Sequence, residues 1–347
     1  MDRKILFYDT KPYDRRFFDE ANKKYGLEIQ YLSEHLNETT SAFSVGYDAI
    51  CAFVNDNLNA RIINDLVKNQ VSLVAMRSAG YNNVDLKAAF GKIHIVRVPG
   101  YSPYAVAEHA MALILCLNRK IHKAYSRTRD GNFSITGLLG FDLYGKTAGV
   151  IGTGQIGNCM INILKGFGMN VLAFDKVKNK EFAGTAGFKY VSLDELYKKS
   201  HIITLHCPLT PETKYLINKD SILKMRQGVM IINTGRGGLI NTRDLIAGLK
   251  SGHIGSAGLD VYEEEGEYFF EDFSGIVISD DVLARLLTFP NVLITSHQGF
   301  FTQEALTNIA EITLANVKEF YDGGYLKNEI CYRCDGKCKK NLKQRCF

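Results

Sequence analysis

Short apolar segments alternate with longer amphipathic segments along two stretches of the chain. In the first hundred residues, amphipathic runs at 14–26 and 60–70 separate β-branched or aromatic runs at 4–8, 28–32, 49–53, 71–76 and 92–96. From Lys146 onward, apolar runs recur at 146–152, 170–175, 202–207, 228–234, 254–262 and 292–297. This alternation predicts an α/β fold with parallel sheets whose faces are covered by helices.

Two longer helices are predicted outside this alternation. Residues 102–128 are strongly apolar, with Ser102 suited to cap the helix and Pro103 suited to its first turn. A helix this apolar is expected to be buried on most sides, at a domain or subunit junction. A second helix over 302–324 ends in glycines and closes the folded part of the chain.

Composition bounds the class of protein. With 347 residues, 46% of them hydrophobic, the chain is long enough for two domains that each have a core. It begins without the pattern of a signal peptide and contains no apolar run of roughly 18 residues. We therefore expect a cytoplasmic protein with no membrane partner.

Positive charge is concentrated at the C-terminus. The formal net charge is +5, and the segment Cys331–Phe347 alone contains six Lys or Arg and one Asp. The rest of the chain is formally neutral, which argues against a nucleic-acid groove on the folded body.

The same segment, 331–347, holds half of the eight cysteines, namely Cys331, Cys334, Cys338 and Cys346. Four thiolates are a ligand set for zinc or an iron–sulfur cluster. Their spacing fits no standard signature, however, and a flexible Cys/Lys-rich tail is the simpler interpretation. We expect no bound metal.

A glycine-rich turn follows the apolar run at Lys146. The sequence KTAGVIGTGQIG places Gly152, Gly154 and Gly157 in the G-x-G-x-x-G spacing of dinucleotide-binding turns. In that motif the first glycine permits the tight turn, the second lets the backbone approach a pyrophosphate, and the third allows close packing of helix on strand. The pattern alone is weak, because such turns also occur for steric reasons.

Asp175 strengthens the interpretation. It ends the next apolar run, 18 residues past Gly157, where a carboxylate accepts hydrogen bonds from the adenosine ribose. The alternative is a solvated residue at a strand end. A carboxylate at this position repels a 2′-phosphate and favours NAD over NADP, although Lys176 and Lys178 weaken that preference.

A dehydrogenase that acts on a hydroxy acid needs a cation for the carboxylate and a proton donor for the carbinol oxygen. Arg236, in the loop NTGRGG after an apolar run, suits the first task, because its planar fork binds carboxylates bidentately. The alternative is an ion-paired surface arginine. For the second task, only His206 and His297 of the eight histidines end strand-like runs, and spacing does not choose between them.

A carboxylate partner would orient the catalytic imidazole. The acidic run YEEEGE offers Glu263, Glu264, Glu265 and Glu267. A run of this kind is usually a solvated loop.

Several segments carry a resemblance to a known family. In chain order they are GKTAGVIGTGQIG, HCPLTPET, MIINTGRGGLINT, GSAGLDVYEEE and NVLITSHQGFFTQEAL. Together they resemble the D-isomer-specific 2-hydroxyacid dehydrogenase family over about residues 3–330. FVNDN, RSAGYNNVDL and VRVPGYSPYAVAEHA further resemble the bacterial branch that interconverts pyruvate and D-lactate with NAD.

The resemblance implies a role for each matching residue. Arg236 would bind the substrate carboxylate, His297 would be the acid/base, and Glu265 would hydrogen-bond that histidine. Glu263 and Glu264 would be solvated neighbours. The implied cofactor residues are Gly152, Gly154, Gln155, Ile156, Gly157, Asp175, Cys207, Pro208, Thr234, Gly235 and Asp260, and the implied substrate residues are Ala79, Gly80, Tyr101, Arg236 and His297.

The resemblance also implies an architecture and an activity. Two Rossmann-like or flavodoxin-like domains are expected: a substrate domain of residues 1–100 and 299–330, and an NAD-binding domain, 101–298, inserted into it. The expected reaction is reversible reduction of pyruvate to D-lactate by NADH in fermentation. The apolar helix after Ser102 independently suggests a subunit interface, so a homo-oligomer (dimer or tetramer) is expected. The alternatives are a larger 2-keto acid, such as phenylpyruvate or 2-ketoisocaproate, and a corepressor-like NADH-sensing binding module.

Overall fold

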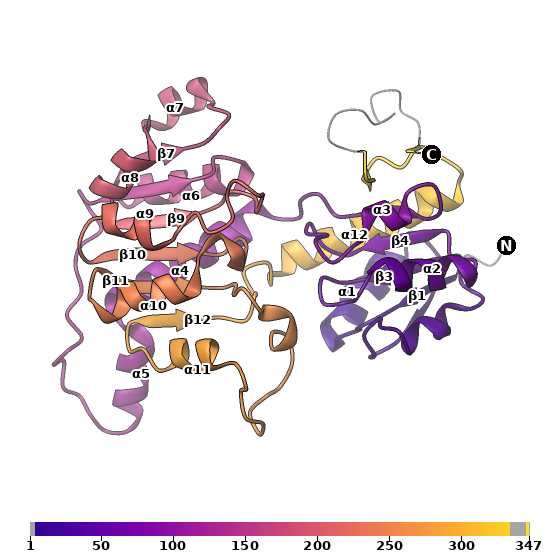
Figure 1. Ribbon diagram of the computed structural model, residues 1–347, viewed down its shortest axis with the longest axis horizontal. Helices are drawn as coiled ribbons and strands as arrows, with labels where there is room; N and C mark the ends of the chain where they lie inside the picture. Colours follow the sequence, from indigo (N-terminus) through magenta and orange to yellow (C-terminus); the bar gives the residue numbers. More distant parts are fainter. Residues whose placement is uncertain (1–3, 334–344, 347) are drawn as a thin grey trace. The chain divides into compact units, whose positions relative to one another are not determined.

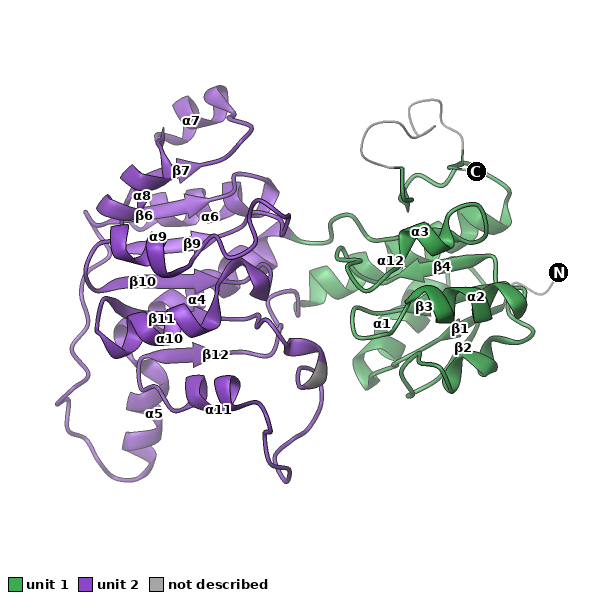
Figure 2. Ribbon diagram, in the orientation of Figure 1, with its two compact units in different colours: residues 1–102, 302–347 green, residues 103–301 purple. Residues whose placement is uncertain are grey.

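The computed structural model describes residues 4–333, 345 and 346 (Figure 1). The chain divides into two compact units, here called unit 1 (residues 1–102 and 302–347) and unit 2 (residues 103–301), which Figure 2 distinguishes by colour. In the described part of the chain each unit contains one main sheet. The predicted α/β class is confirmed.

Unit 1 is built on a sheet of six strands in the order β13-β5-β4-β3-β1-β2. The first five strands in the chain are parallel, in a flavodoxin-like order, and β13 pairs antiparallel with β5 at the edge. The elements are β1 Lys4–Phe7, α1 Pro12–Asn22, β2 Glu28–Tyr31, η1 Thr40–Ser44, β3 Ala49–Ala52, α2 Ala60–Lys68, β4 Leu73–Met76, α3 Leu86–Ala89, β5 His94–Val96, α12 Gln303–Tyr321 and β13 Glu329–Ile330.

The central strands β3 and β4 of unit 1 are buried along their whole length because helices cover both faces of the sheet. Ile50 and Val74 pack with Ile62 and Leu66 of α2 on one face, while α12 contacts α1 and β4. The N-cap of α12 is Thr302, whose side chain accepts a hydrogen bond from the Ala305 N–H. The predicted closing helix therefore belongs to unit 1, although about two hundred residues of unit 2 separate it from β5.

Unit 2 contains a sheet of seven parallel strands in the order β12-β11-β10-β9-β6-β7-β8. The elements are α4 Pro103–Arg119, α5 Ile121–Arg129, β6 Thr147–Ile151, α6 Gln155–Gly166, β7 Asn170–Phe174, α7 Lys180–Ala186, β8 Lys189–Tyr190, α8 Leu193–Lys199, β9 Ile202–Leu205, α9 Lys219–Lys224, β10 Val229–Asn233, η2 Gly237–Leu239, α10 Thr242–Lys250, β11 Ile254–Leu259, η3 Glu265–Glu267, α11 Asp281–Leu287 and β12 Val292–Ile294. This is the doubly wound Rossmann order, which reverses between β6 and β9.

Successive strand residues of unit 2 point to opposite apolar layers. Met230 and Ile232 pack toward α4 and α6, whereas Ile231 packs toward α9 and α10. Because both faces are covered, the strands are continuous apolar runs. The strand order reverses between β6 and β9. Doubly wound sheets bind ligands at such a reversal point, beyond the carboxyl ends of the strands.

The prediction of one buried helix over 102–128 is wrong in its second half. Helix α4 ends at Arg119, Lys120 has a left-handed φ of 51°, and α5 has no buried residue. The break coincides with the returning segment 139–141, where Asn118 exchanges two hydrogen bonds with the Phe141 backbone. Long-range partners therefore override local periodicity here.

The C-terminal tail is only partly described. Cys331 and Cys346 are buried in unit 1, and the Cys346 N–H donates to the Glu329 carboxylate at 2.7 Å. Cys334 and Cys338 lie outside the described residues, and so does the four-thiolate alternative. Among the helices that the structure describes, none has both the length and the apolar composition required to cross a membrane.

Candidate active site

The glycine turn joins β6 to α6 in unit 2. Gly152 has a φ of +94°, and a Cβ there would lie 2.5 Å from the Cys207 backbone nitrogen. A Cβ on Gly157 would lie 2.0 Å from the Gly152 carbonyl oxygen. These two glycines therefore let the turn pass directly over the end of β9.

Gly154 has a different environment. A Cβ at this position would meet nothing within 4 Å. Gly154 is also the N-cap of α6, so no side chain caps the first N–H groups, which include those of Gln155 and Ile156. An open approach to an uncapped helix N-terminus fits a pyrophosphate.

Asp175 lies directly after β7. One carboxylate oxygen accepts hydrogen bonds from the backbone N–H of Thr153 at 2.6 Å and from its hydroxyl at 3.0 Å, and the other accepts from the Val177 N–H at 2.9 Å. Partial burial acts to raise the pKa of Asp175, but these hydrogen bonds outweigh it and lower the pKa. The group is therefore a carboxylate at neutral pH, beside the glycine turn.

Four further predicted cofactor residues follow β9 and β10. Burial raises the pKa of Cys207 to about 11, so its thiol stays neutral, and Pro208 next to it is exposed. Thr234 is buried, and its hydroxyl has no hydrogen-bond partner among the described residues. The Gly235 N–H donates to the Asn233 side chain. A buried hydroxyl without a protein partner fits a bound polar ligand.

Arg236 is the N-cap of η2, in the loop that follows β10. Its guanidinium is half-buried and donates to the Gly235 carbonyl oxygen at 2.8 Å. In the described part of the chain no carboxylate lies within ion-pair distance of Arg236. Among the described residues, Arg236 is therefore not an ion-paired surface arginine. Its positive charge is available to an anionic ligand.

His297 lies just beyond β12, with its Nδ1 2.8 Å from a carboxylate oxygen of Glu265. The other oxygen of Glu265 accepts the Tyr262 N–H at 2.9 Å. About a fifth of each side chain is exposed. The carboxylate therefore favours the tautomer with hydrogen on Nδ1, and the Nε2 atom has no hydrogen-bond partner among the residues described.

The backbone of His297 is held in the left-handed region, at a φ of 47°. Its N–H donates to the Asp260 carbonyl oxygen at 2.8 Å. The Asp260 carboxylate accepts the N–H groups of Gln298 and Gly299 at 2.9 and 2.8 Å. The surrounding loop thus maintains an uncommon conformation at the site.

His109 and Thr295 complete this support, and the sequence did not single them out for the site. Thr295 donates its hydroxyl hydrogen to Asp260 at 2.6 Å, and His109 on α4 lies 3.0 Å from Thr295 and 3.2 Å from Asp260. The available signal was a histidine within an apolar helix, because a buried polar group needs a partner. Asp260 is therefore engaged in fixing the histidine loop.

Glu263 and His206 also follow strands at this sheet edge, and Glu263 differs from the expectation. Glu263 is not merely solvated, since its carboxylate accepts the Thr242 N–H at 2.8 Å at the start of α10. His206 lies 2.8 Å from the Thr204 hydroxyl, and burial lowers its pKa to about 4. A histidine that stays neutral at physiological pH is poorly suited to proton transfer.

The remaining predicted substrate residues belong to unit 1. Ala79 and Gly80 are half-buried in the loop after β4, where the Ala79 carbonyl oxygen accepts a hydrogen bond from Arg97 at 2.6 Å. Tyr101 is near the end of the first segment of unit 1, and its carbonyl oxygen accepts from Asn308 at 2.6 Å.

The doubly wound sheet, the glycine turn and the histidine–glutamate pair at the carboxyl edge define a dinucleotide-dependent dehydrogenase class. Residues 111–299 match the family model described as D-isomer specific 2-hydroxyacid dehydrogenase, NAD binding domain. This chain belongs to the D-isomer specific 2-hydroxyacid dehydrogenase family.

Individual relatives cover nearly the whole chain. A 2-hydroxyacid dehydrogenase homolog of Haemophilus influenzae is 52% identical, and a D-lactate dehydrogenase of Escherichia coli is 49% identical; each match covers 94% of this chain and 99% of the relative. The solved apo-structure of D-lactate dehydrogenase from Escherichia coli matches with a TM-score of 0.87 and 47% identity, over 94% of this chain and 99% of that one.

Proposed function

We propose that this protein is a D-lactate dehydrogenase that reduces pyruvate to D-lactate with NADH, reversibly, and regenerates NAD in fermentation. The observation that carries the proposal is the 2.8 Å contact between His297 and Glu265, on the same sheet edge as the half-buried Arg236. Its relative in Escherichia coli, named a D-lactate dehydrogenase, supports the choice of substrate.

The residues proposed to hold NAD lie on the carboxyl edge of the unit 2 sheet. NAD, when bound, supplies or accepts the hydride of the reaction. The uncapped N-terminus of α6 would hold the pyrophosphate, and the Asp175 carboxylate would accept hydrogen bonds from the ribose hydroxyls. The full proposed set is Gly152, Gly154, Gln155, Ile156, Gly157, Asp175, Cys207, Pro208, Thr234, Gly235 and Asp260.

The remaining steps belong to this chain's own side chains. Arg236 binds the carboxylate of pyruvate bidentately. The N–H groups of Ala79 and Gly80 in unit 1 are proposed as further donors to that carboxylate, and Tyr101 as a further substrate residue. His297 donates the Nε2 proton to the keto oxygen as the carbon is reduced. Glu265 stabilises the imidazolium before that transfer. The net reaction consumes pyruvate, NADH and one proton, and the reverse reaction returns the proton to Nε2.

The two units take different roles in this proposal. Residues 101–298 form the NAD-binding domain, and residues 1–100 and 299–330 form the substrate domain. Because the proposed reaction regenerates NAD in fermentation, we place it in the cytoplasm.

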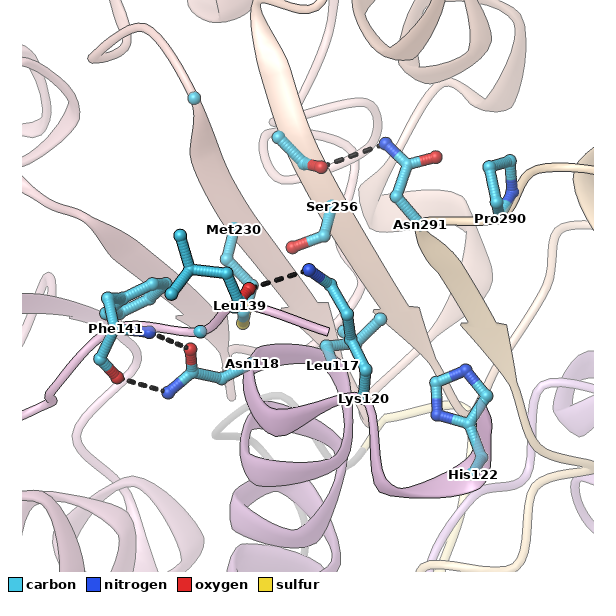
Figure 3. A pocket seen from close by; sticks show the side chains of 13 residues that line it. Leu117, Asn118, Lys120, His122, Leu139, Phe141, Met230, Ser256, Pro290 and Asn291 are labelled. Carbon is cyan, nitrogen blue, oxygen red and sulfur yellow. Dashed lines mark hydrogen bonds between the residues drawn. The ribbon is translucent and has the colours of Figure 1, made fainter. Parts of the chain in front are cut away.

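The proposed enzyme is a homo-oligomer, a dimer or tetramer. The segment from α5 to β6 exposes Phe133, Ile135, Leu139 and Tyr144, each with 78% or more of its surface accessible. It also borders a pocket of about 190 Å³ at the amino ends of β10 and β11, lined in part by Leu117 and Met230 (Figure 3). Several exposed apolar side chains on one segment favour a protein interface there.

Oxidation of NADH on a panel of 2-keto acids tests the substrate assignment. Turnover that is highest with pyruvate supports the proposal. A preference for phenylpyruvate or 2-ketoisocaproate would change the substrate within the same reaction. NADH binding without turnover on any acid would favour a corepressor-like binding module.

A further inference from the structure

In the loop after β4 in unit 1, the backbone carbonyl groups of three residues accept hydrogen bonds from the protein. The Ser78 carbonyl oxygen accepts the Val98 N–H at 3.1 Å, the Ala79 carbonyl oxygen accepts from the Arg97 guanidinium at 2.6 Å, and the Gly80 carbonyl oxygen accepts from the Ser78 hydroxyl at 2.7 Å. Three consecutive carbonyl groups are thus taken by protein donors.

The N–H groups of the same loop are not. Within residues 4–333, 345 and 346, the N–H groups of Ala79, Gly80 and Tyr81 donate no hydrogen bond. In a planar trans peptide the C=O and the following N–H point in opposite directions. A donor that holds one carbonyl therefore turns the N–H of the next residue away from that donor. Successive N–H groups without protein partners are able to bind an anion.

Arg97 holds the central carbonyl, and its own position is fixed from several directions. Its guanidinium lies 5.1 Å from the centre of the Tyr81 ring. Its backbone carbonyl accepts the Asn316 side chain of α12 at 3.0 Å, and its N–H donates to Asn328 at 3.2 Å. No carboxylate of the described residues lies within ion-pair distance, so its positive charge remains beside the loop.

From these contacts we infer that Arg97 is a positioning residue for the substrate carboxylate. It orients the Ala79–Gly80 peptide so that the Gly80 N–H is presented to the carboxylate, and its charge favours an anion at the loop. Ser78 orients the following peptide in the same way. The inference rests on the proposed function, in which this loop binds the carboxylate of a 2-keto acid.

Steady-state kinetics of four variants test the inference. Arg97→Met removes the donor and the charge, Arg97→Lys keeps the charge and one donor, and Ser78→Ala removes the neighbouring hydroxyl. Arg15→Met is the matched control, because Arg15 is exposed on α1 and also contacts an aromatic ring, that of Tyr31, at 4.9 Å. NADH affinity and the melting temperature are measured for each.

Arg97→Met is expected to raise the KM for the best 2-keto acid by about 10- to 100-fold, the range of a lost hydrogen bond to a charged group. The kcat should change less than KM, since the loop binds the carboxylate equally throughout the reaction. Arg97→Lys should recover most of the loss, Ser78→Ala should raise KM by a smaller factor, and Arg15→Met should resemble the wild type.

A substrate without the carboxylate separates positioning from general damage. Because methyl pyruvate has no carboxylate charge, the preference for pyruvate over methyl pyruvate should fall in Arg97→Met. An unchanged preference, or an equal loss of NADH affinity, overturns the inference. If Arg97→Met does not fold, the preference for pyruvate over methyl pyruvate is measured in Ser78→Ala and Arg97→Lys and tests the inference in the same way. A wild-type protein that reduces no 2-keto acid contradicts the proposed function itself, whereas an active wild type with an unaltered Arg97→Met contradicts only the role of Arg97.

Discussion

The Nδ1 atom of His297 lies 2.8 Å from the carboxylate of Glu265, although 32 residues separate them in the chain. Glu265 belongs to η3 after β11, and His297 follows β12, the neighbouring strand. The contact therefore exists because two parallel strands end at the same edge. It leaves Nε2 of His297 as the nitrogen that we propose exchanges a proton with the substrate.

Replacing His297 tests the proton transfer. His297→Gln should lower kcat by about 10²–10⁴-fold, because the developing alkoxide loses its proton donor. NADH affinity, measured by fluorescence titration, should remain at the wild-type value. Turnover within a few-fold of the wild type would show that another group supplies the proton.

The two directions of the reaction should have opposite pH dependence. His297 must carry a proton for pyruvate reduction and must lack it for lactate oxidation, so raising the pH should slow reduction and accelerate oxidation. Rates in both directions across about pH 5 to 8 measure this. His206→Asn is the control, because burial holds the pKa of His206 at about 4 and it does not titrate in that range. Coincident profiles for the two directions would contradict the assignment.

Asp175 should set the preference for NAD over NADP. Asp175→Ser removes a carboxylate whose pKa is lowered by hydrogen bonds from Thr153 and Val177 and which is therefore charged at neutral pH. The ratio of kcat/KM for NADPH to that for NADH should rise by roughly 10-fold or more, since one like-charge repulsion is worth about 1.4 kcal/mol or more at close range. An unchanged ratio would place the ribose recognition elsewhere.

Arg77 should contribute strongly to the stability of unit 1. Its buried guanidinium lies 4.6 Å from the centres of the Phe7 and Phe53 rings, and its nitrogens lie 3.6 and 3.7 Å from the carboxylates of Asp9 and Asp14. Arg77→Met leaves Asp14 without its cation and Asp9 with Lys11 alone, so the free energy of unfolding should fall by about 3–5 kcal/mol.

A matched exposed ion pair provides the control for Arg77. Arg61 contacts Glu38 at 2.6 Å, with more than half of its own side chain accessible. Arg61→Met should change the free energy of unfolding by less than about 1 kcal/mol in the same urea titration. Equal effects of the two variants would mean that the buried cluster is not held by Arg77.

The exposed apolar segment should mediate self-association. Ile135→Asp and Leu139→Asp should shift the species measured by light scattering toward the monomer, because a charge would be buried in the interface. Leu223→Asp, at a position on α9 that is 66% exposed, should leave the mass unchanged. A monomeric wild type would contradict the proposal of a homo-oligomer.

Local sequence patterns determined the main strands of this protein and its glycine turn. The apolar runs at 146–152, 170–175 and 228–234 became β6, β7 and β10, because a strand buried on both faces requires apolar residues in succession. The glycines at positions 152 and 157 likewise permit a tight turn, because a Cβ atom on either residue would collide with the backbone. These features depend on residues that are close in the chain.

Partnerships between distant side chains were decided only by the tertiary structure. Asp260 contacts His109 on α4 and the loop around His297, and the helix expected over 102–128 ends at Arg119, where residues 139–141 return to it. The choice between His206 and His297, open on spacing alone, depends on which of them the fold brings to a carboxylate and for which of them desolvation lowers the pKa. Periodicity is a property of neighbours along the chain, whereas a hydrogen bond or a pKa depends on the strand order that brings remote residues together.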